Sequence, residues 1–230
     1  MISSRQREAG MSETISIENE QVFRRPPVIG TPAPLFVART TMGERALTSY
    51  RGRWLVFFSH PADFTPVCTS EFVAFSRAYD KFEELGCDLL AMSVDSLFSH
   101  FAWVNSIRER FGVAVPFPIA EDPSMVIAAA YGMLQDGAQD SSTVRGTFVI
   151  DPEGVIRAIS CYPMSTGRSV AEILRLVEAL QTADAQMAST PEGWTKGDPV
   201  IDALPLDVAE LASFVPSETS PDWYYRLRRS

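Results

Sequence analysis

Cysteine and histidine are scarce in this chain, which has three cysteines and two histidines among 230 residues. An odd number of widely spaced cysteines without a paired motif excludes a disulfide framework or a cysteine-rich zinc site, and it indicates reduced thiols in a reducing compartment. The two histidines, His60 and His100, are far apart in the sequence, and neither stands beside a second ligand-type residue. We therefore expect no metal site, and we expect His100 to be solvated on a helix face.

Long apolar runs and an excess of basic residues are also missing. No stretch approaches the ~20 apolar residues of a membrane span, and the N-terminus lacks the apolar core of a secretory signal. The 20 basic and 29 acidic residues give a net charge of −9, which opposes attraction to nucleic acid or anionic lipid. We expect a cytoplasmic protein that binds neither nucleic acid nor membrane. Its hydrophobic content of 46% is ample for a packed core.

The distribution of apolar residues divides the chain into three parts. Residues 1–28 are polar and mixed in charge, and we expect a flexible lead in which either Met1 or Met11 starts the protein. Residues 29–182 alternate strand-like and helix-like segments, which predicts an α/β fold with a mixed central sheet flanked by helices. Residues 183–230 are interrupted by proline and glycine and lack a periodic pattern, so we expect an irregular C-terminal arm.

Local signals place the boundaries of several elements. Apolar residues at three- and four-residue steps predict one helix over 66–85, and Asp122 followed by proline predicts the start of another. The segment 151–154 suits a type I turn between two β-rich segments. The segment 169–172 is a capping box that opens a last helix, whose pattern breaks past Gln181.

The stretch 60–71, HPADFTPVCTSE, carries the one cysteine that is placed for chemistry. It follows the apolar segment 54–58, which is typical of a central strand buried on both faces. Thr65 is a good N-cap and Pro66 suits the first helical position, so Cys68 lies in the first turn of a helix. Unpaired N–H groups and the helix dipole favour an anion there, and we therefore expect a thiolate nucleophile.

Pro61, Thr65 and Cys68 form a Pro-x-x-x-Thr-x-x-Cys pattern that resembles the active-site signature of the peroxiredoxins. The longer run is most similar to the branch that contains the one-cysteine and archaeal enzymes. Arg145, on a strand-like segment, and Arg168, after the next strand, stand where that family has them. The resemblance runs from about residue 32 to the end of the chain, and it implies a thioredoxin-like fold with the arm at its end.

The resemblance also implies a role for each of these residues. Cys68 would attack one oxygen of a hydroperoxide and become a sulfenic acid. Thr65 and Arg145 would hold the peroxide in line with the sulfur and stabilise the charge that develops. Pro61 would pack over the site and shield the sulfenic acid, unless it is only a turn proline. Arg168 would add a second positive charge near the thiolate.

For two residues beside the motif, Glu71 and His60, the sequence leaves two interpretations open. Glu71 either complements the positive end of the helix dipole or orients the arginines, and His60 either tunes the pocket or is a hydrogen-bonded loop histidine. Cys87 and Cys161 fall at strand ends, and neither lies in a pattern typical of a resolving thiol. We therefore expect a one-cysteine mechanism.

The resulting interpretation is a thiol-dependent peroxidase that reduces hydrogen peroxide and small organic hydroperoxides without a cofactor or metal. An external thiol, from thioredoxin, glutaredoxin or a small molecule, would restore the cysteine. The resemblance also implies a homodimer, or a ring of dimers such as a decamer, in which the arm crosses a partner subunit. The alternative is a peroxide-sensing redox relay or a holdase-like binding protein that uses the same cysteine.

Overall fold

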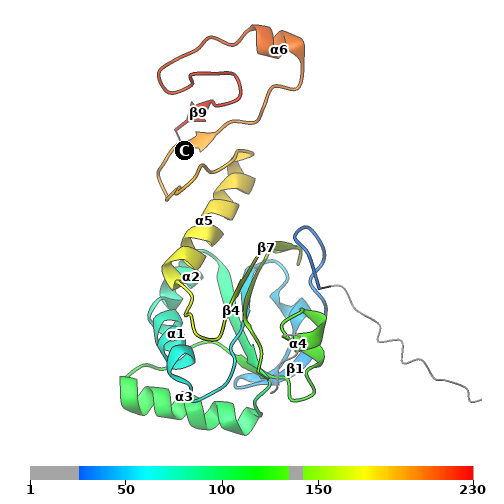
Figure 1. Cartoon of the computed structure of the whole chain (residues 1–230), viewed down its shortest axis with the longest axis vertical. Helices are drawn as coiled ribbons and strands as arrows, with labels where there is room; N and C mark the ends of the chain where they lie inside the picture. The colour runs from blue at the N-terminus through cyan, green and yellow to red at the C-terminus, as the bar shows by residue number, and fades with distance from the viewer. Residues whose placement is uncertain (1–25, 135–141, 230) are drawn as a thin grey trace, which may run out of the picture.

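The computed structural model describes residues 26–134 and 142–229, so nearly all of the expected N-terminal lead lies outside the described residues (Figure 1). Within them a seven-stranded mixed sheet has the order β2-β1-β5-β4-β3-β6-β7. The strands are β1 (Val37–Thr40), β2 (Gly43–Ala46), β3 (Trp54–Ser59), β4 (Cys87–Ser93), β5 (Ile119–Glu121), β6 (Arg145–Ile150) and β7 (Ile156–Tyr162). The mixed sheet confirms the α/β class that the sequence predicts.

Helices cover both faces of this sheet. One face packs against α1 (Pro66–Arg77), α2 (Tyr79–Glu84), α3 (Leu97–Phe111) and α5 (Val170–Gln186), and the other packs against α4 (Val126–Ala130) and the 3-10 turn η1 (Leu47–Tyr50). Strand β3 is buried along its whole length. Val56 and Phe58 join the core under α1, whereas Leu55 and Phe57 join the core under α4. The apolar run without alternation therefore has the physical cause that the sequence suggests, namely burial on both faces.

The order and direction of the strands bring four segments of the chain to one edge of the sheet. β3 and β4 are parallel, so both end at that edge, whereas β6 is antiparallel to β3 and begins there. β7 is antiparallel to β6 and ends at the same edge. The loop after β3, the helix after β4, the first residue of β6 and the loop after β7 therefore meet.

The chain beyond α5 leaves the sheet. Figure 1 shows α5 leading away from the other helices, with β8 (Val200–Ile201), α6 (Val208–Ala212) and β9 (Leu227–Arg228) past its end. β8 and β9 pair in an antiparallel two-stranded sheet, which joins the beginning of the arm to its end. Within the arm Trp194 is only 2% exposed, and its indole N–H donates to the carbonyl of Asp198 at 3.1 Å.

Several local predictions can be compared directly with the structure. The predicted turn is closed by a hydrogen bond from the Gly154 N–H to the Asp151 carbonyl at 2.8 Å. The capping box is confirmed in part, because the Ser169 hydroxyl accepts the Glu172 N–H at 3.2 Å.

Three helix boundaries were predicted wrongly. The helix over 66–85 is broken at Ala78, whose φ and ψ of −96° and 0° separate α1 from α2. Helix α4 begins later than the aspartate-proline signal suggests, at Val126, because Met125 takes a left-handed conformation with φ of 58°. Helix α5 continues past Gln181.

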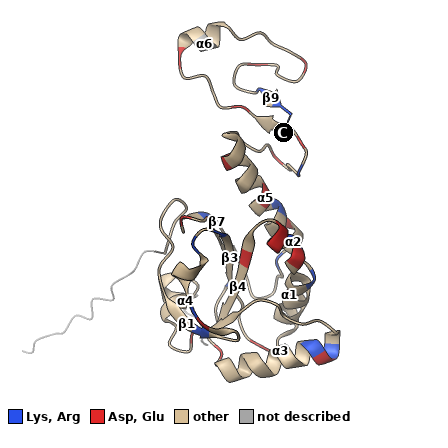
Figure 2. Cartoon of the chain, turned by 180° about the vertical axis from the view of Figure 1, so that it is seen from behind, with Lys and Arg blue, Asp and Glu red and all other residues tan. Residues whose placement is uncertain are grey.

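Basic and acidic residues are both distributed over the helices and strands (Figure 2). Arg108 and Arg110 lie in the last turn of α3, where they complement the negative end of the helix dipole. In the described part of the chain, no helix combines the length and the apolar character that a membrane span requires.

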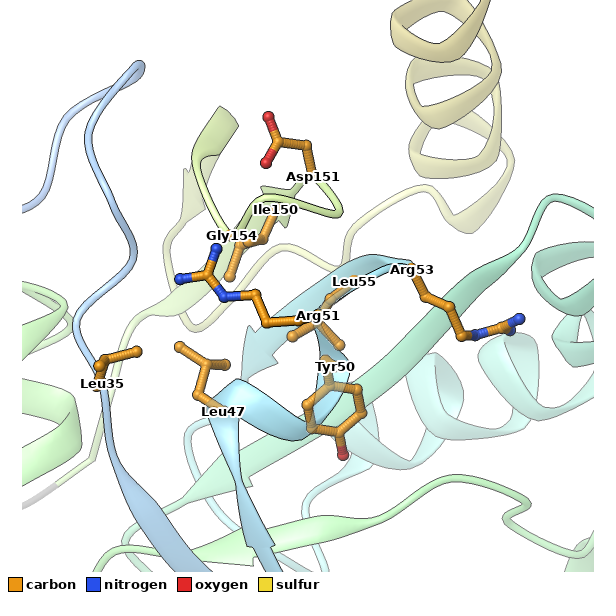
Figure 3. Close-up of a pocket in the computed structure, with 9 residues that line it drawn as sticks. All are labelled: Leu35, Leu47, Tyr50, Arg51, Arg53, Leu55, Ile150, Asp151 and Gly154. Atoms are coloured by element: carbon orange, nitrogen blue, oxygen red, sulfur yellow. The ribbon is translucent and has the colours of Figure 1, made fainter.

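A small pocket lies at the opposite edge of the sheet, where β3 begins and β6 ends (Figure 3). Its lining includes Tyr50, Arg51 and Asp151. Burial raises the pKa of Tyr50 to about 12, so its hydroxyl stays protonated at neutral pH. The pocket and the cysteine motif lie at opposite ends of β3, and no residue of the motif lines the pocket.

Candidate active site

Cys68 lies in the first turn of α1, as the sequence predicts, and its side chain is fully buried. Helix α1 begins at Pro66, preceded by Thr65 in an extended conformation with φ of −99° and ψ of 149°. The extended residue before a proline and the proline at the first helical position together fix where the helix starts. The sulfur is thereby held at the end of the helix that carries the positive pole of the dipole.

Thr65 occupies the N-cap position, but its hydroxyl does not cap the helix. The hydroxyl donates instead to the carbonyl of Ala62 at 2.8 Å, which closes a turn of the loop. The Thr65 carbonyl accepts the Thr69 hydroxyl at 2.7 Å. Thr65 thus shapes the loop in this structure, and its expected bond to a bound peroxide stays a prediction.

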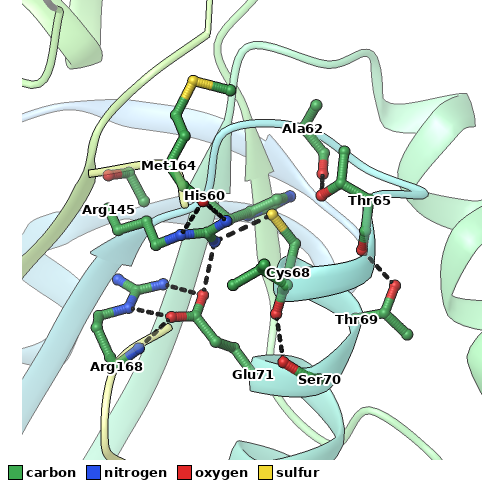
Figure 4. Close-up of polar contacts among 12 residues, drawn as sticks. His60, Ala62, Thr65, Cys68, Thr69, Ser70, Glu71, Arg145, Met164 and Arg168 are labelled. Carbon is green, nitrogen blue, oxygen red and sulfur yellow. Dashed lines mark hydrogen bonds and ion pairs between the residues drawn. The ribbon is translucent and has the colours of Figure 1, made fainter. Parts of the chain in front are cut away.

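Arg145 contacts the sulfur directly (Figure 4). Its Nη1 lies 3.2 Å from Sγ of Cys68 and 3.0 Å from Oε2 of Glu71. Nε and Nη2 both donate to the carbonyl of Met164, at 3.2 and 2.7 Å. The guanidinium is therefore oriented from three directions, and it is only 2% exposed. A rigid fork of donors on the sulfur can favour thiolate and can stabilise charge in the transition state.

Arg168 lies on the other side of Glu71. Its Nε and Nη2 donate to the two carboxylate oxygens at 2.9 and 2.8 Å, and its backbone N–H adds a third bond at 2.8 Å. Nη1 donates to the Gly146 carbonyl at 2.9 Å, and the guanidinium lies 5.1 Å from the centre of the Phe58 ring. Arg168 does not contact the sulfur among the described interactions, so it acts on Cys68 only through charge and through Glu71.

The structure places Glu71 between the two arginines rather than free at the helix start. Burial acts to raise its pKa, but the hydrogen bonds and charge of Arg168 and the charge of Arg145 outweigh that effect, and the pKa is lowered. The carboxylate is therefore ionised at neutral pH. Two guanidinium groups and one carboxylate give this buried group a net charge of +1, which a thiolate would neutralise.

The expectation that His100 is solvated was wrong. His100 and His60 are both fully buried, and Asp63 joins them: its Oδ1 lies 2.9 Å from Nε2 of His60 and its Oδ2 lies 2.8 Å from Nδ1 of His100. The two histidines are distant in the sequence but meet because β3 and β4 end at the same edge. His60 is thus a hydrogen-bonded loop histidine, as one of its two interpretations holds.

These three side chains are donors of the kind that bind zinc, and their ligand atoms all lie within 4.8 Å of one another. The premise that neither histidine is near a second ligand-type residue therefore fails. Both carboxylate oxygens of Asp63 already face a ring nitrogen at hydrogen-bonding distance. Hydrogen bonding accounts for this arrangement without an ion.

Sequence reasoning missed Asp63, His100 and Met164. A signal for His100 was available, because His100, Trp103 and Ile107 are spaced as one face of a helix, and all three are buried in α3. Met164 contributes only a backbone carbonyl, which its residue type could not reveal. Pro61 is buried in the loop, as a role in shielding the site requires.

The other two cysteines are remote from Cys68 in the sheet. Cys87 pairs with Trp54 at the start of β3, and burial raises its pKa to about 12. Cys161 is exposed on the outer strand β7, opposite Gly146. Because Arg145 and Gly146 are adjacent in a strand, their side chains point to opposite faces, and Cys161 lies on the face away from Cys68.

Comparison with known proteins gives a consistent result. The AhpC/TSA family model matches residues 29–159. The peroxiredoxin of Aquifex aeolicus is 50% identical over 169 residues, which cover 73% of this chain and 76% of that relative. Peroxiredoxin 2 of Caldanaerobacter subterraneus subsp. tengcongensis is 46% identical over 201 residues, which cover 86% of this chain and 91% of that relative.

Solved structures with the same fold are also peroxiredoxins. The peroxiredoxin 6 of Arenicola marina superimposes with a TM-score of 0.79 at 29% identity, covering 88% of this chain and 97% of that one. A yeast mitochondrial 1-Cys peroxiredoxin superimposes with a TM-score of 0.77 at 36% identity, covering 88% of this chain and 99% of that one. The expected thioredoxin-like fold is thereby confirmed.

Proposed function

The chain belongs to the AhpC/TSA family and is a peroxiredoxin, a thiol-dependent peroxidase, and we propose that it works by a one-cysteine cycle centred on Cys68. The observation that carries the proposal is the 3.2 Å contact between Nη1 of Arg145 and the sulfur of the fully buried Cys68. A permanent cation at that distance favours the charged nucleophile.

In the proposed cycle the Cys68 thiolate attacks one oxygen of the hydroperoxide as the O–O bond breaks. The sulfur is oxidised to a sulfenic acid, and the leaving oxygen takes a proton and departs as water or an alcohol. One external thiol then attacks the sulfenic sulfur and releases water, leaving a mixed disulfide. A second external thiol attacks this disulfide, which restores Cys68 and yields the oxidised reductant.

The positions of the remaining cysteines support an external reductant. Cys87 and the Cys68 loop lie at opposite ends of β3, which are roughly 17 Å apart at about 3.3 Å per residue. A disulfide needs Cα atoms within roughly 7 Å. Cys161 lies on the opposite face of the sheet, so neither thiol reaches the sulfenic acid of its own chain without unfolding.

The proposed substrates are hydrogen peroxide and small organic hydroperoxides, because the Cys68 side chain is fully buried and a small peroxide needs the least displacement of its neighbours. The proposed reductant is thioredoxin, glutaredoxin or a small thiol. The yeast mitochondrial relative of similar structure is described as resolving its thiol through glutathione and thioredoxin systems, which supports this class of reductant.

We further propose a homodimer or a ring of dimers. In the arm, Val208 and Val215 are each 79% exposed, and Trp223 and Tyr225 are each 39% exposed. Figure 1 shows that this arm lies past the end of α5, away from the sheet of its own chain. The apolar surface of the arm is suited to burial against a second copy.

Intact mass spectrometry after one equivalent of peroxide tests the one-cysteine cycle. We expect one added oxygen on the wild type and on the Cys87→Ser/Cys161→Ser double variant, and none on Cys68→Ser. Excess small thiol should then restore the mass and sustain turnover. A loss of two hydrogens, or a disulfide-linked dimer that disappears in the double variant, would show that the enzyme resolves itself. A single turnover despite excess thiol would favour a redox relay.

A further inference from the structure

Ser59 is the last residue of β3, and its side chain is fully buried beside the start of β6. The paired register of β3 and β6 ends one residue earlier, at Phe58 and Thr147. Beyond this pair a side chain joins the two segments instead. The Gly146 N–H donates to Oγ of Ser59 at 3.0 Å, and the same hydroxyl donates to the carbonyl of Val144 at 2.6 Å.

These two hydrogen bonds lie on either side of Arg145 in the chain. The Val144 carbonyl belongs to the peptide group before the Cα atom of Arg145, and the Gly146 N–H belongs to the peptide group after it. The orientations of these two planar groups define φ and ψ of Arg145, and with them the direction of its Cα–Cβ bond. One hydroxyl group therefore fixes both backbone torsion angles of the residue that contacts the sulfur.

Strand β7 supports Arg145 from the other side. In the register of β6 and β7, Arg145 is opposite Tyr162. Backbone groups of successive residues in a strand point to opposite neighbouring strands, so those of Arg145 face β7 while those of Val144 and Gly146 face β3. Removing the Ser59 hydroxyl takes away the partner on the β3 side, and an unpaired buried backbone group is costly enough to make the chain shift.

The guanidinium of Arg145 has little freedom to compensate for such a shift. Its nitrogens contact Sγ of Cys68 at 3.2 Å, Oε2 of Glu71 at 3.0 Å and the Met164 carbonyl at 2.7 Å, and these three partners come from two separate segments of the chain. A displacement of about 1 Å at a reacting group can cost on the order of 100-fold in rate. The position of the Arg145 backbone is therefore expected to influence the reaction.

Gly146 allows the hydroxyl to approach the strand this closely. A Cβ atom at residue 146 would lie 3.3 Å from Oγ of Ser59 and 3.3 Å from Cε2 of Phe148. A methyl group there would press on the Ser59 hydroxyl without removing any hydrogen-bonding group. Gly146→Ala is therefore a second way to disturb the same contact.

We propose that Ser59 is a positioning residue for Arg145, whose backbone it holds so that the guanidinium is directed at the sulfur of Cys68. The inference rests on the proposed function. Among the described interactions Ser59 does not contact the sulfur, and its hydroxyl forms and breaks no covalent bond in the proposed cycle. Its effect on the rate therefore depends on the presence of Arg145, whereas an effect on folding alone does not.

A double-mutant cycle between Ser59→Ala and Arg145→Met tests this dependence. Stopped-flow oxidation of the pre-reduced, full-length protein by hydrogen peroxide gives the second-order rate constant of each variant. We expect Ser59→Ala to slow the reaction at least about tenfold when Arg145 is present and less than about twofold in Arg145→Met, where the group that it positions is already absent. Slowing by the same factor in both backgrounds, or a wild-type rate for a folded Ser59→Ala, would overturn the inference.

Ser93→Ala is the matched control. Ser93 ends the neighbouring strand β4 and is also fully buried. Its hydroxyl likewise donates one hydrogen bond and accepts one, but both join it to Asp95, at 2.8 and 3.1 Å. We expect the two alanine variants to lose similar stability in urea unfolding, while only Ser59→Ala loses rate. Equal slowing by both variants would reduce Ser59 to a structural role and overturn the inference.

Gly146→Ala keeps the inference testable if Ser59→Ala does not fold. We expect it to slow the reaction by a smaller factor than the loss of the hydroxyl does, and again only when Arg145 is present. An unchanged rate, or equal slowing in both backgrounds, would contradict the inference and leave the proposed function intact. A wild-type Cys68 that is no more reactive than a free thiol would instead overturn the proposed function, so the two failures are distinguishable.

Discussion

The Arg145→Met substitution removes the guanidinium that lies 3.2 Å from the sulfur, and it keeps an unbranched side chain in the space. The site is buried, so no bulk water replaces the lost donor. Removing one preorganised donor from a developing charge in such a site typically costs about 100- to 1,000-fold in rate, or about 3–4 kcal/mol. We expect a loss of this size in the second-order rate constant for hydrogen peroxide.

The same substitution has a smaller effect on stability. Glu71 keeps three hydrogen bonds from Arg168 when Arg145 is replaced, so the carboxylate is not left unpaired. The carbonyl of Met164 loses two donors, but Met164 is 45% exposed, and water can replace them. The rate should therefore fall much further than the free energy of unfolding.

Arg168→Met is the matched control, because it removes an identical charge that does not touch the sulfur. It takes two side-chain bonds from Glu71 and one each from Gly146 and Thr147, all in a buried group, and leaves only the backbone N–H bond to Glu71. Breaking one partner of a buried ion pair costs about 3–5 kcal/mol of stability. Arg168→Met should therefore lower stability more than Arg145→Met does, and it should slow the reaction less.

The assay is stopped-flow oxidation of the pre-reduced protein by excess peroxide, followed by intrinsic tryptophan fluorescence, with urea unfolding of the same samples. Measurements near neutral pH and at a pH where the thiol is fully ionised separate an effect on thiolate content from one on the transition state. Wild-type rates for Arg145→Met at both pH values would remove Arg145 from the mechanism. Equal slowing by a fully stable Arg168→Met would show that charge alone matters, without contact.

Three further predictions concern pH, the arm and the loop. The folded pKa values of Asp63, Glu71 and His60 are all lowered, so the stability that each group contributes is complete above its unfolded pKa and is lost as the pH falls. Urea unfolding should therefore show stability declining first below about pH 6.5, where His60 takes up a proton in the unfolded chain, and again below about pH 4, where Asp63 and Glu71 do. Stability that is constant from pH 7 to about pH 5 would contradict the lowered pKa of His60. Removal of residues 203–230 should shift light scattering to a smaller mass while the melting temperature of the core changes little, and an unchanged mass would exclude the arm from the interface. Phe64 has φ of 57° and is 58% exposed, so Phe64→Gly should relieve backbone strain and cost at most about 1 kcal/mol of stability, whereas a larger loss in thermal unfolding would mean that its ring is needed.

Features encoded by neighbouring residues could be predicted from the sequence. The start of α1 depends on Thr65 and Pro66, the turn at 151–154 on local turn residues, and the start of α5 on Ser169. In each case the residues that decide the structure are within four positions of one another. The break at Ala78 could not be predicted in this way, because the apolar spacing continues through it and only the packing of α2 on the sheet requires the change of direction.

The active site shows the limit of local reasoning more clearly. Arg145 and Arg168 lie 74 and 97 residues from Glu71, and only the resemblance to a known family placed them near Cys68. Asp63 and His100 are 37 residues apart, and no motif joins them. Which carboxylate meets which base depends on the order of the strands, since the ends of β3, β4 and β7 and the start of β6 share an edge. That order is a property of the whole sheet.

Glu71 explains how two arginines can be buried beside one sulfur. Two guanidinium groups alone would place two like charges in a buried region, which is costly, whereas the shared carboxylate reduces the net charge to +1. That single positive charge can balance a thiolate, and of the two arginines only Arg145 contacts the sulfur among the described interactions. In the proposed cycle Arg168 serves the reaction through Glu71. Its three hydrogen bonds to Glu71 fix the carboxylate, and its bonds to Gly146 and Thr147 fix its own guanidinium. The carboxylate and the Met164 carbonyl in turn fix Arg145. In the proposed cycle the reactivity of Cys68 thus depends on the net charge of Glu71 and the two arginines, and Arg168, which does not contact the sulfur among the described interactions, helps to set the position of Arg145 through Glu71.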